Sequence, residues 1–530
     1  MTDDALPALV GDASTVCGIV RSTLGPFGAT KLVVDEHGNV TATDSGSIVL
    51  EELDVDNPAV KTFRRAATVF ERSYGDGATT LVTLVGGLLD EADRLAGMGL
   101  HPTAIERGYR EGLSSAVGSL DRRARPLGEP GLGPAAVARS ALTGTRNPHV
   151  RERLGSYLAE AVEAITAETG EFDPDMVKVV ARLGGAEGET ELVHGVVLGR
   201  DPVAEAMPRT LRDVGIAVVS ETVDVPSIGG PTNDRSLTFR FSPESFEDRA
   251  AIGDQERERF QEQLQDAHDA GLRVLLSEMG INERVQRTLA NHGVLAIHQV
   301  DEEDVARLAR ATGATVVPGL GQVNEGTLGH GTARVVRRAG RDMTVVEAEG
   351  DAPVYTLFCR APDERAVESF ERSVEHALAA VTSARRTDTV VPGGGAIETA
   401  AAGDVREHAR SVSGREALAV EAFGDALTAV PRTLARNAGL DGGLSLVRLR
   451  VAHHEGRDAT GVDCLSGELV DVVEEGIVDP VDLKREVWTA ATELACYLLR
   501  IDEQLAADDL ERQDPDVAEA RAEREPPEWQ

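Results

Sequence analysis

The stretch Ser73–Ala96, SYGDGATTLVTLVGGLLDEADRLA, joins a glycine-rich turn to an amphipathic helix. Seven apolar residues recur in it at helical spacing and predict one buried face: Leu81, Leu84, Val85, Leu88, Leu89, Ala92 and Leu95. The first N–H groups of a helix lack intrahelical partners and attract phosphate. Asp76, within the Gly75–Gly77 turn, is placed to hold Mg²⁺ against phosphate oxygens. Thr79 and Thr80 add hydroxyl donors. The alternative interpretation is a plain turn with an N-cap.

Other nucleotide motifs are missing from the sequence. No lysine follows a glycine, so a P-loop with its Gly-Lys pair is excluded. The glycine pairs in GLGPAA, GHGTAR and GGGAIE do not follow a strand with the full dinucleotide-binding spacing, and there is no Gly-x-Ser-x-Gly elbow. The Gly75–Gly77 turn is therefore the best phosphate candidate that the residues alone provide.

The charge of the chain excludes one class of partner. With 90 Asp and Glu against 54 Lys and Arg, the net charge is −36, and this field repels nucleic acid. Lysine occurs only four times, at Lys31, Lys61, Lys178 and Lys484, so arginine supplies the other 50 cations. A hydrated acidic surface adapted to high salt explains the excess without implying a function.

Length and composition predict a cytoplasmic protein of two to four domains with no membrane partner. The chain has 530 residues, 41% of them hydrophobic, and no apolar run of the roughly 20 residues that a bilayer span needs. No basic-then-apolar leader precedes Ala5. Cys17, Cys359, Cys464 and Cys496 form no CxxC pair and are expected to be buried fillers in a reducing compartment. The pair His453-His454 is expected on a surface loop.

Local patterns divide the chain into helical and mixed regions. Alternating apolar residues around His37–Asn39 predict a hairpin, and residues 125–134, RPLGEPGLGP, predict a linker. A polar helix around Phe260 has only a thin apolar stripe with Leu264 and Ala267, so it either projects or packs weakly. Short apolar runs that alternate with helices predict an α/β domain with strands near 215–220, 273–280, 293–300 and 313–319.

The whole chain, apart from its final tail, resembles the group II chaperonins of the thermosome family. The resemblance rests on several motifs in the right order: residues 22–61 beginning STLGPFGATK, then YGDGATTLVTLVGGLL, GGAEGETELVHGVVL, EEDVARLARATGATVV, VVPGGGAIETAA and, from residue 461, GVDCLSGELVDVVEEGIVDPVDLKREVW. An ordered series of motifs is more specific than any one of them.

This resemblance implies a multi-domain α+β chaperonin fold with three domains. These are a helical equatorial domain that binds ATP, a small intermediate hinge domain, and an α/β apical domain whose helical protrusion includes the polar helix. The implied ranges are equatorial 1–134 and 391–506, intermediate 135–201 and 353–390, apical 202–352, and a disordered acidic tail 507–530.

The resemblance also assigns a pocket for ATP or ADP with Mg²⁺, residue by residue. Leu24, Gly25 and Pro26 would line the base and sugar side, and Asp479 would accept a ribose hydroxyl. Asp76 would hold the metal. The remaining positions would meet the phosphates or pack on the nucleotide: Gly77, Ala78, Thr79, Thr80, Gly394 and Gly395.

Three positions depart from the family pattern in the part that serves hydrolysis. Ala78 replaces the first threonine of G-D-G-T-T-T. Ser45, in DSGSIVL, replaces an aspartate, and Asp44 stands one residue early. His376, in EHAL, stands where a water-orienting aspartate is expected. Phosphoryl transfer depends on a positioned water and a fixed metal, so hydrolysis is expected to be slow or absent.

Two interpretations of His376 stay open. A neutral imidazole titrates near pH 6.5 and could act as a general base, or the residue is merely tolerated where selection for hydrolysis has relaxed. The family implies stacked rings of chaperonin subunits that enclose non-native polypeptides. This chain is therefore expected to be an ATP-binding folding chaperone, or a non-hydrolysing structural or regulatory subunit that assembles with competent paralogues.

Overall fold

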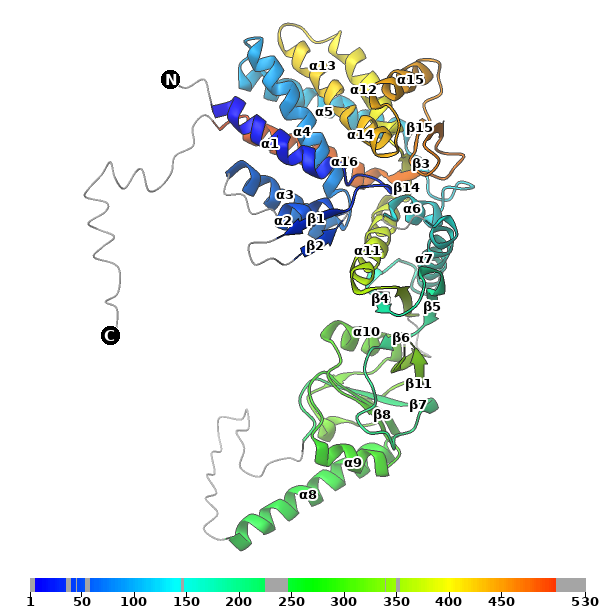
Figure 1. Cartoon of the computed structure of the whole chain (residues 1–530). Helices are drawn as coiled ribbons and strands as arrows, with labels where there is room; N and C mark the ends of the chain where they lie inside the picture. Colours follow the sequence, from blue (N-terminus) through cyan, green and yellow to red (C-terminus); the bar gives the residue numbers. More distant parts are fainter. Residues whose placement is uncertain are drawn as a thin grey trace, which may run out of the picture. The chain divides into compact units, whose positions relative to one another are not determined.

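The computed structural model describes residues 5–34, 40–43, 45–52, 58–143, 147–224, 246–338, 340–348 and 353–501. They form two compact units (Figure 1). Unit 1 combines the two ends of the chain, Met1–Arg146 and Ala379–Gln530, and unit 2 is the middle, Asn147–Leu378. Asp44 and the predicted tail 507–530 lie outside the described residues.

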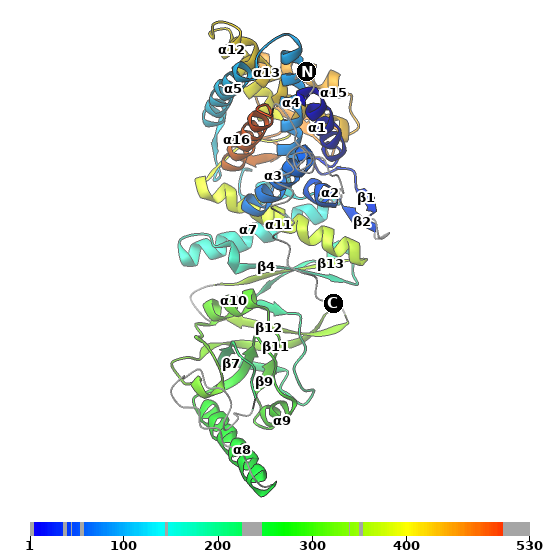
Figure 2. The same cartoon turned by 90° about the vertical axis from the view of Figure 1, so that its left-hand side faces the viewer.

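Unit 1 is mainly helical. Figure 2 shows α1 and α16, which come from opposite ends of the chain, packed beside α4. Its helices are α1 (Ala5–Arg21), α2 (Gly46–Glu52), α3 (Pro58–Tyr74), α4 (Ala78–Gly97), α5 (Pro102–Arg123), α6 (Pro134–Ala141), α12 (Ala396–Ala409), α13 (Glu416–Leu427), α14 (Ala429–Asn437), α15 (Gly442–His454) and α16 (Val481–Leu498).

Three small sheets complete unit 1. The two strands of the predicted hairpin are present as β1 (Lys31–Val34) paired antiparallel with β2 (Val40–Thr43), and the turn around His37–Asn39 lies outside the described residues. The others are the sheet β17-β14-β3, with β3 (Arg125–Pro126), β14 (Thr389–Pro392) and β17 (Val478–Pro480), and the pair β15 (Thr460–Asp463) with β16 (Glu468–Asp471).

Helix α4 is the centre of the core of unit 1, as its apolar spacing predicts. All seven residues of the predicted face are at most 1% exposed. Tyr109 of α5 donates a hydrogen bond from its hydroxyl to the Leu88 carbonyl at 2.6 Å and meets Phe423 of α13 edge-on. Trp488 of α16 is fully buried in the same core. These contacts hold the middle of α4 in the core of unit 1.

Unit 2 contains the predicted α/β architecture. Its main sheet has the order β6-β12-β11-β7-β8-β9, with β10 also paired to β7. All four predicted strands lie in this sheet, within or overlapping β7 (Thr210–Val219), β8 (Leu272–Ser277), β9 (Leu295–Ile297) and β10 (Val316–Val317), and they pair with one another in parallel. The other strands of the sheet are β6 (Val196–Leu198), β11 (Gly329–Arg338) and β12 (Arg341–Ala348).

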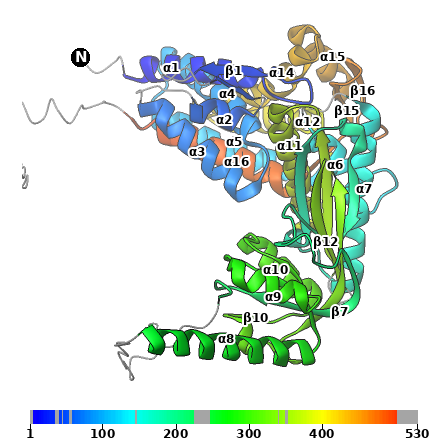
Figure 3. The same cartoon turned by 60° about the horizontal axis from the view of Figure 1, so that its bottom comes forward.

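Helices α8, α9 and α10 accompany this sheet (Figure 3). A second sheet, β4-β13-β5, completes the unit with α7 and the beginning of α11. The bounds are α7 (Pro148–Thr169), α8 (Phe246–Asp269), α9 (Glu283–Asn291), α10 (Glu302–Thr312), α11 (Glu364–Thr387), β4 (Val177–Leu183), β5 (Glu191–His194) and β13 (Tyr355–Ala361).

The thin stripe on the polar helix is used for packing. Phe260, Leu264 and Ala267 are at most 3% exposed, so this half of α8 packs against unit 2. Figure 1 shows the other end of α8 extending beyond the sheet. The multi-domain α+β prediction is confirmed, while the division of the chain into equatorial, intermediate and apical domains stays a prediction.

Two local expectations are wrong. The stretch 125–134 is not a linker, because β3 pairs with β14 and Leu127 and Leu132 are at most 2% exposed. His453 and His454 end helix α15 instead of lying on a loop. The Nε2 of His453 is 2.8 Å from the Thr460 carbonyl oxygen, and burial lowers the pKa of its ring.

The expectation that the cysteines are buried and unpaired is confirmed. All four are free and buried. Burial raises the pKa of the Cys17 thiol to about 12 and that of Cys496 to about 11, so neither is a thiolate at neutral pH.

Candidate functional site

Among the described helices of unit 1, α4 and α12 begin at glycines in the left-handed region, which offer no side chain to cap the helix N-terminus. Gly77 precedes α4 with φ 89°, and Gly395 precedes α12 with φ 77°; no side chain caps either helix. Both φ values lie in the left-handed region, which glycine adopts without strain. Glycine offers no side chain to cap these helices, and the Ala396 amide of α12 donates instead to the Gly393 carbonyl at 2.9 Å. The amide groups at a helix N-terminus carry partial positive charge, which favours an anion.

Close packing also requires glycine at both positions. A β-carbon on Gly77 would lie 2.9 Å from Val487 Cγ2 of α16, and one on Gly395 would lie 2.6 Å from Pro431 Cβ of α14. Both turns are thus held tightly against neighbouring helices. Thr80 is half-buried in the first turn of α4, and Ala78, where the family has threonine, is buried.

Asp76 lies between the two glycines of the first turn. Its Oδ1 accepts a hydrogen bond from the Gly77 amide at 2.6 Å. Among the described residues there is no group of three or more His, Cys, Asp or Glu side chains that could hold a metal. Mg²⁺ bound to a nucleotide does not need such a group, because one or two carboxylates, the phosphates and water complete its shell. The single carboxylate of Asp76 fits that chemistry.

The start of α2 lies next to the start of α4. Ser45 precedes α2, and its carbonyl accepts the Val49 amide at 3.1 Å. A β-carbon on the next residue, Gly46, would lie 2.6 Å from Thr79 Oγ1 of α4 and 3.3 Å from Thr23 Oγ1. The Ser45 hydroxyl is 2.8 Å from that of Ser47. The structure therefore brings Ser45 and Gly46, the first turn of α4 and the end of α1 together.

The loop Leu24–Pro26 is joined to the second glycine turn through α14. The Asn437 side-chain amide donates to the Leu24 carbonyl at 2.8 Å, and a β-carbon on Gly25 would lie 2.9 Å from Leu434 Cδ2. Pro431 on the same helix packs against Gly395. Leu24 itself is only 8% exposed and belongs to a small apolar cluster with Leu434. The side chain of Leu24 thus mainly packs this loop against α14.

Gly394 and Asp479 are fixed by the neighbouring strands. The Val462 amide of β15 donates to the Gly394 carbonyl at 2.8 Å. Asp479 of β17 lies opposite Val391 of β14, the strand that leads into the glycine turn. Asp479, the residue predicted to accept a ribose hydroxyl, therefore lies on the strand next to the one that leads into the Gly394–Gly395 turn.

A residue that the pattern analysis did not select completes the group. Lys484 of α16 pairs with Glu398 of α12 at 2.7 Å and with Asp479 at 3.0 Å. Burial alone lowers the pKa of Lys484, but the charges of Asp479 and Glu398 outweigh burial, and the pKa is raised. Its rarity was the available signal, because it is one of four lysines in a chain with 50 arginines.

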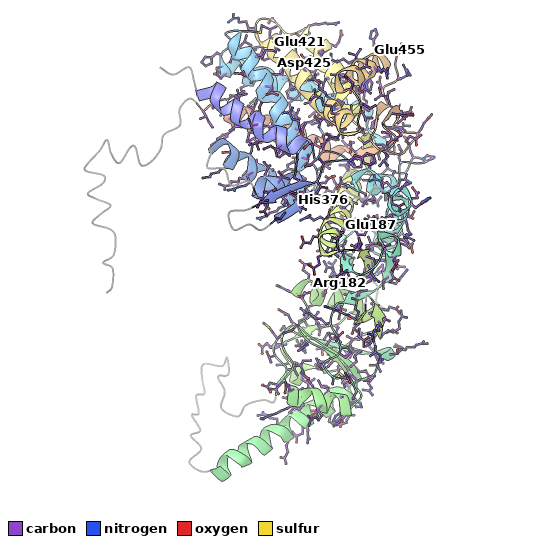
Figure 4. The ribbon with its side chains drawn as sticks, viewed as in Figure 1. Arg182, Glu187, His376, Glu421, Asp425 and Glu455 are labelled. Carbon is purple, nitrogen blue, oxygen red and sulfur yellow. The ribbon has the colours of Figure 1, made fainter. Side chains whose placement is uncertain are left out.

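His376 lies on α11, where Figure 4 labels it, and belongs to unit 2. It is not part of the group described for unit 1. Asp44 lies outside the described residues. The hydrolytic roles predicted for Asp44, Ser45 and His376 therefore stay predictions.

Comparison with known proteins agrees with this arrangement. The model of the TCP-1/cpn60 chaperonin family matches residues 16–509. A thermosome subunit of Methanopyrus kandleri is 37% identical over 510 residues, covering 94% of this chain and 91% of that protein. Thermosome subunit alpha of Halobacterium salinarum is 36% identical over 510 residues, covering 96% and 89%.

The helices in the described part of the chain do not combine the length and hydropathy that crossing a membrane requires.

The family model spans most of the sequence, and the relatives are similar over nearly their whole lengths. The chain belongs to the TCP-1/cpn60 chaperonin family, as a group II chaperonin.

Proposed function

We propose that unit 1 binds ATP or ADP with Mg²⁺. The observation that carries this proposal is that two helices of the same compact unit begin at left-handed glycines, Gly77 and Gly395, and that the first of these turns holds the carboxylate of Asp76. Amide groups at helix N-termini bind phosphate, and the carboxylate of Asp76 adds the metal ligand.

The other contacts follow the same arrangement. The hydroxyl groups of Thr79 and Thr80 donate hydrogen bonds to the phosphates. Leu24–Pro26 lines the pocket on the side of the base and sugar. Gly394 packs against the nucleotide, and Asp479 accepts a ribose hydroxyl. The chain then has the family's three domains, with the equatorial domain in unit 1 and the intermediate and apical domains largely in unit 2.

Nucleotide binding is retained while hydrolysis is weak. Ala78 lacks the hydroxyl of the family threonine, and Ser45 hydrogen-bonds water without accepting a proton at neutral pH. His376 then acts as a base or has no role in the chemistry. Loss of two carboxylates that position metal and water lowers turnover by several orders of magnitude if nothing replaces them.

The protein works as a subunit of a double ring that assists the folding of non-native polypeptides. Within that assembly this chain has one of two roles. It drives its own cycle slowly, or it is a structural or regulatory subunit that moves with hydrolysing paralogues. Size-exclusion chromatography of the chain alone and with sister subunits, together with phosphate release, separates these roles.

The first test measures binding and turnover on the same assembled sample. Calorimetry with ADP should show Mg²⁺-dependent binding that Asp76→Asn abolishes. Asp93→Asn, which removes an equal charge from the exposed side of α4, should leave binding unchanged. If the wild-type chain binds neither ADP nor ATP, the proposed site is wrong.

The second test restores the family's carboxylates. The double variant Ser45→Asp/His376→Asp should raise phosphate release by at least about a hundredfold, because a positioned carboxylate contributes about 10²- to 10⁴-fold to such reactions. Wild-type turnover at the rate of an ordinary chaperonin would contradict weak hydrolysis. A double variant with unchanged turnover would show that these two positions are not the hydrolytic ones.

A further inference from the structure

Lys484, Glu398 and Asp479 form an ion triad in which one carboxylate is fully buried and the other is partly exposed. The side chain of Lys484 is 10% exposed, that of Glu398 is fully buried, and that of Asp479 is 30% exposed. The ammonium therefore joins a carboxylate of the core to one that solvent and ligands can reach. Charge-assisted hydrogen bonds of this kind are short and orient both partners.

The two carboxylates lie on elements that the candidate site also uses. Glu398 is in the first turn of α12, three residues after the Gly395 cap, where the helix dipole favours a negative charge. Asp479 immediately precedes Pro480, the N-cap of α16. Lys484, in the second turn of α16, thus ties the glycine turn and the β17 strand to one ammonium group.

The triad also tunes the charge that a nucleotide would meet. Three charges sum to −1, so the lysine cancels one of two negative charges near a polyanionic ligand. A carboxylate whose one oxygen is held by an ammonium keeps lone pairs for a hydroxyl donor. Glu398 Oε2 is buried and receives no hydrogen bond from the described residues, so the inner carboxylate depends on Lys484 for its ion pairing.

We propose that Lys484 is a positioning residue for nucleotide binding: it anchors Asp479 to the buried Glu398 so that the Asp479 carboxylate faces the ribose hydroxyls. This inference rests on the proposed function, because it needs a nucleotide in unit 1. Its specific consequence is discrimination between ribose and deoxyribose nucleotides. A lysine that only stabilised the fold would weaken both kinds of nucleotide equally.

The test compares Mg²⁺-bound ADP with 2′-deoxy-ADP and 3′-deoxy-ADP by calorimetry on the full chain. A hydrogen bond to a charged carboxylate makes ADP bind about tenfold more tightly than the analogue that lacks the hydroxyl. Because Lys484→Met leaves Glu398 unpaired, the double variant Lys484→Met/Glu398→Gln replaces the buried pair with neutral side chains of similar shape. In this double variant the ratio of the two dissociation constants, deoxy analogue over ADP, should fall to about one. The affinity for the deoxy analogue itself should change by less than about threefold.

Two further variants make the result specific. Asp479→Asn by itself should remove the preference for ADP over the deoxy analogue. Adding Lys484→Met/Glu398→Gln to Asp479→Asn should have no further effect on this preference, because all three changes act through the Asp479 carboxylate. Lys178→Met, which removes the largely buried lysine of unit 2, should leave the ratio unchanged.

The outcomes separate the two proposals. Wild-type protein that binds none of the three nucleotides overturns the proposed function and this inference with it. Wild-type protein that binds all three equally keeps the function but overturns the role of Asp479 and Lys484. A tenfold preference that survives the double replacement overturns Lys484 as the positioning residue while Asp479 stands.

Discussion

Each unit holds one largely buried lysine, and the two have opposite electrostatic outcomes. Lys484 in unit 1 contacts two carboxylates, Glu398 and Asp479. Lys178 in unit 2 contacts one, Asp304, and donates to the Val197 carbonyl at 2.9 Å. Burial lowers the pKa of both, but the two carboxylates outweigh burial at Lys484, whose pKa is raised, whereas the pKa of Lys178 is lowered.

The partners differ in a second way. Asp304 also receives Arg307 Nη1 at 3.1 Å, so its charge is shared between two cations. Among the described residues Glu398 has Lys484 as its ion-pair partner. In unit 1 two anions share one cation, whereas in unit 2 the buried Asp304 pairs with two cations, one of which, Arg307, also pairs with the exposed Glu303. Removing the lysine should therefore be much more costly in unit 1.

This comparison also explains why lysine persists in a chain that otherwise uses arginine. An ammonium is a compact point charge, while a guanidinium is a broad planar fork. A slot closed by Glu398 on one side and Asp479 on the other accommodates the smaller group. Lys178, held by Asp304 and the Val197 carbonyl, meets the same constraint.

The largest effect is expected from Lys484→Met. It leaves a fully buried carboxylate without its cation, a change that costs about 3–5 kcal/mol. Urea unfolding followed by the fluorescence of Trp488, which is buried in unit 1, reports this loss when Trp529→Phe removes the other tryptophan signal. The double variant Lys484→Met/Glu398→Gln should recover most of it. A single variant as stable as wild type would show that Glu398 is not held as a charged partner.

A smaller effect is expected from Lys178→Met, about 1–3 kcal/mol, because Arg307 still neutralises Asp304. Hydrogen exchange of the amides in β4 and α10 should speed up accordingly, while the Trp488 transition of unit 1 stays in place. Combining Lys178→Met with Arg307→Met should bring the loss close to that of the unit 1 variant. If the two single lysine variants lose the same stability, the number of partners is not what distinguishes the sites.

Much of this frame was predictable from the sequence, and the reasons for the failures are physical. The buried face of α4 and the four strands near 215–317 were found because each is a local, periodic pattern. The stretch 125–134 was mistaken for a linker because proline and glycine also occur in packed turns. The role of Lys484 was missed because its partner Glu398 is 86 residues away, a pairing that no local pattern contains.

His453 extends the comparison to a partly buried base that has no carboxylate in hydrogen-bonding contact. Its Nε2–H donates to the Thr460 carbonyl in the neutral form, with Asp458 and Arg123 as the neighbouring charges. Burial lowers the pKa of His453 below its ordinary value of 6.5, so below pH 6.5 the unfolded chain takes up a proton that the folded chain does not. The contribution of neutral His453 to the free energy of unfolding is therefore complete above pH 6.5. It is lost as the pH falls toward the pKa of the folded state, by at most about 1.4 kcal/mol per pH unit.

The variant His453→Gln keeps an amide donor for Thr460 but removes this proton. Between pH 6.5 and 5.5 its Trp488 unfolding midpoint in urea should fall less steeply than that of the wild-type chain. All carboxylates are common to both chains, so the difference in slope isolates the histidine. Equal slopes would mean that His453 is protonated as readily in the fold as outside it, and that a buried base here keeps its charge without the paired carboxylates that Lys484 has.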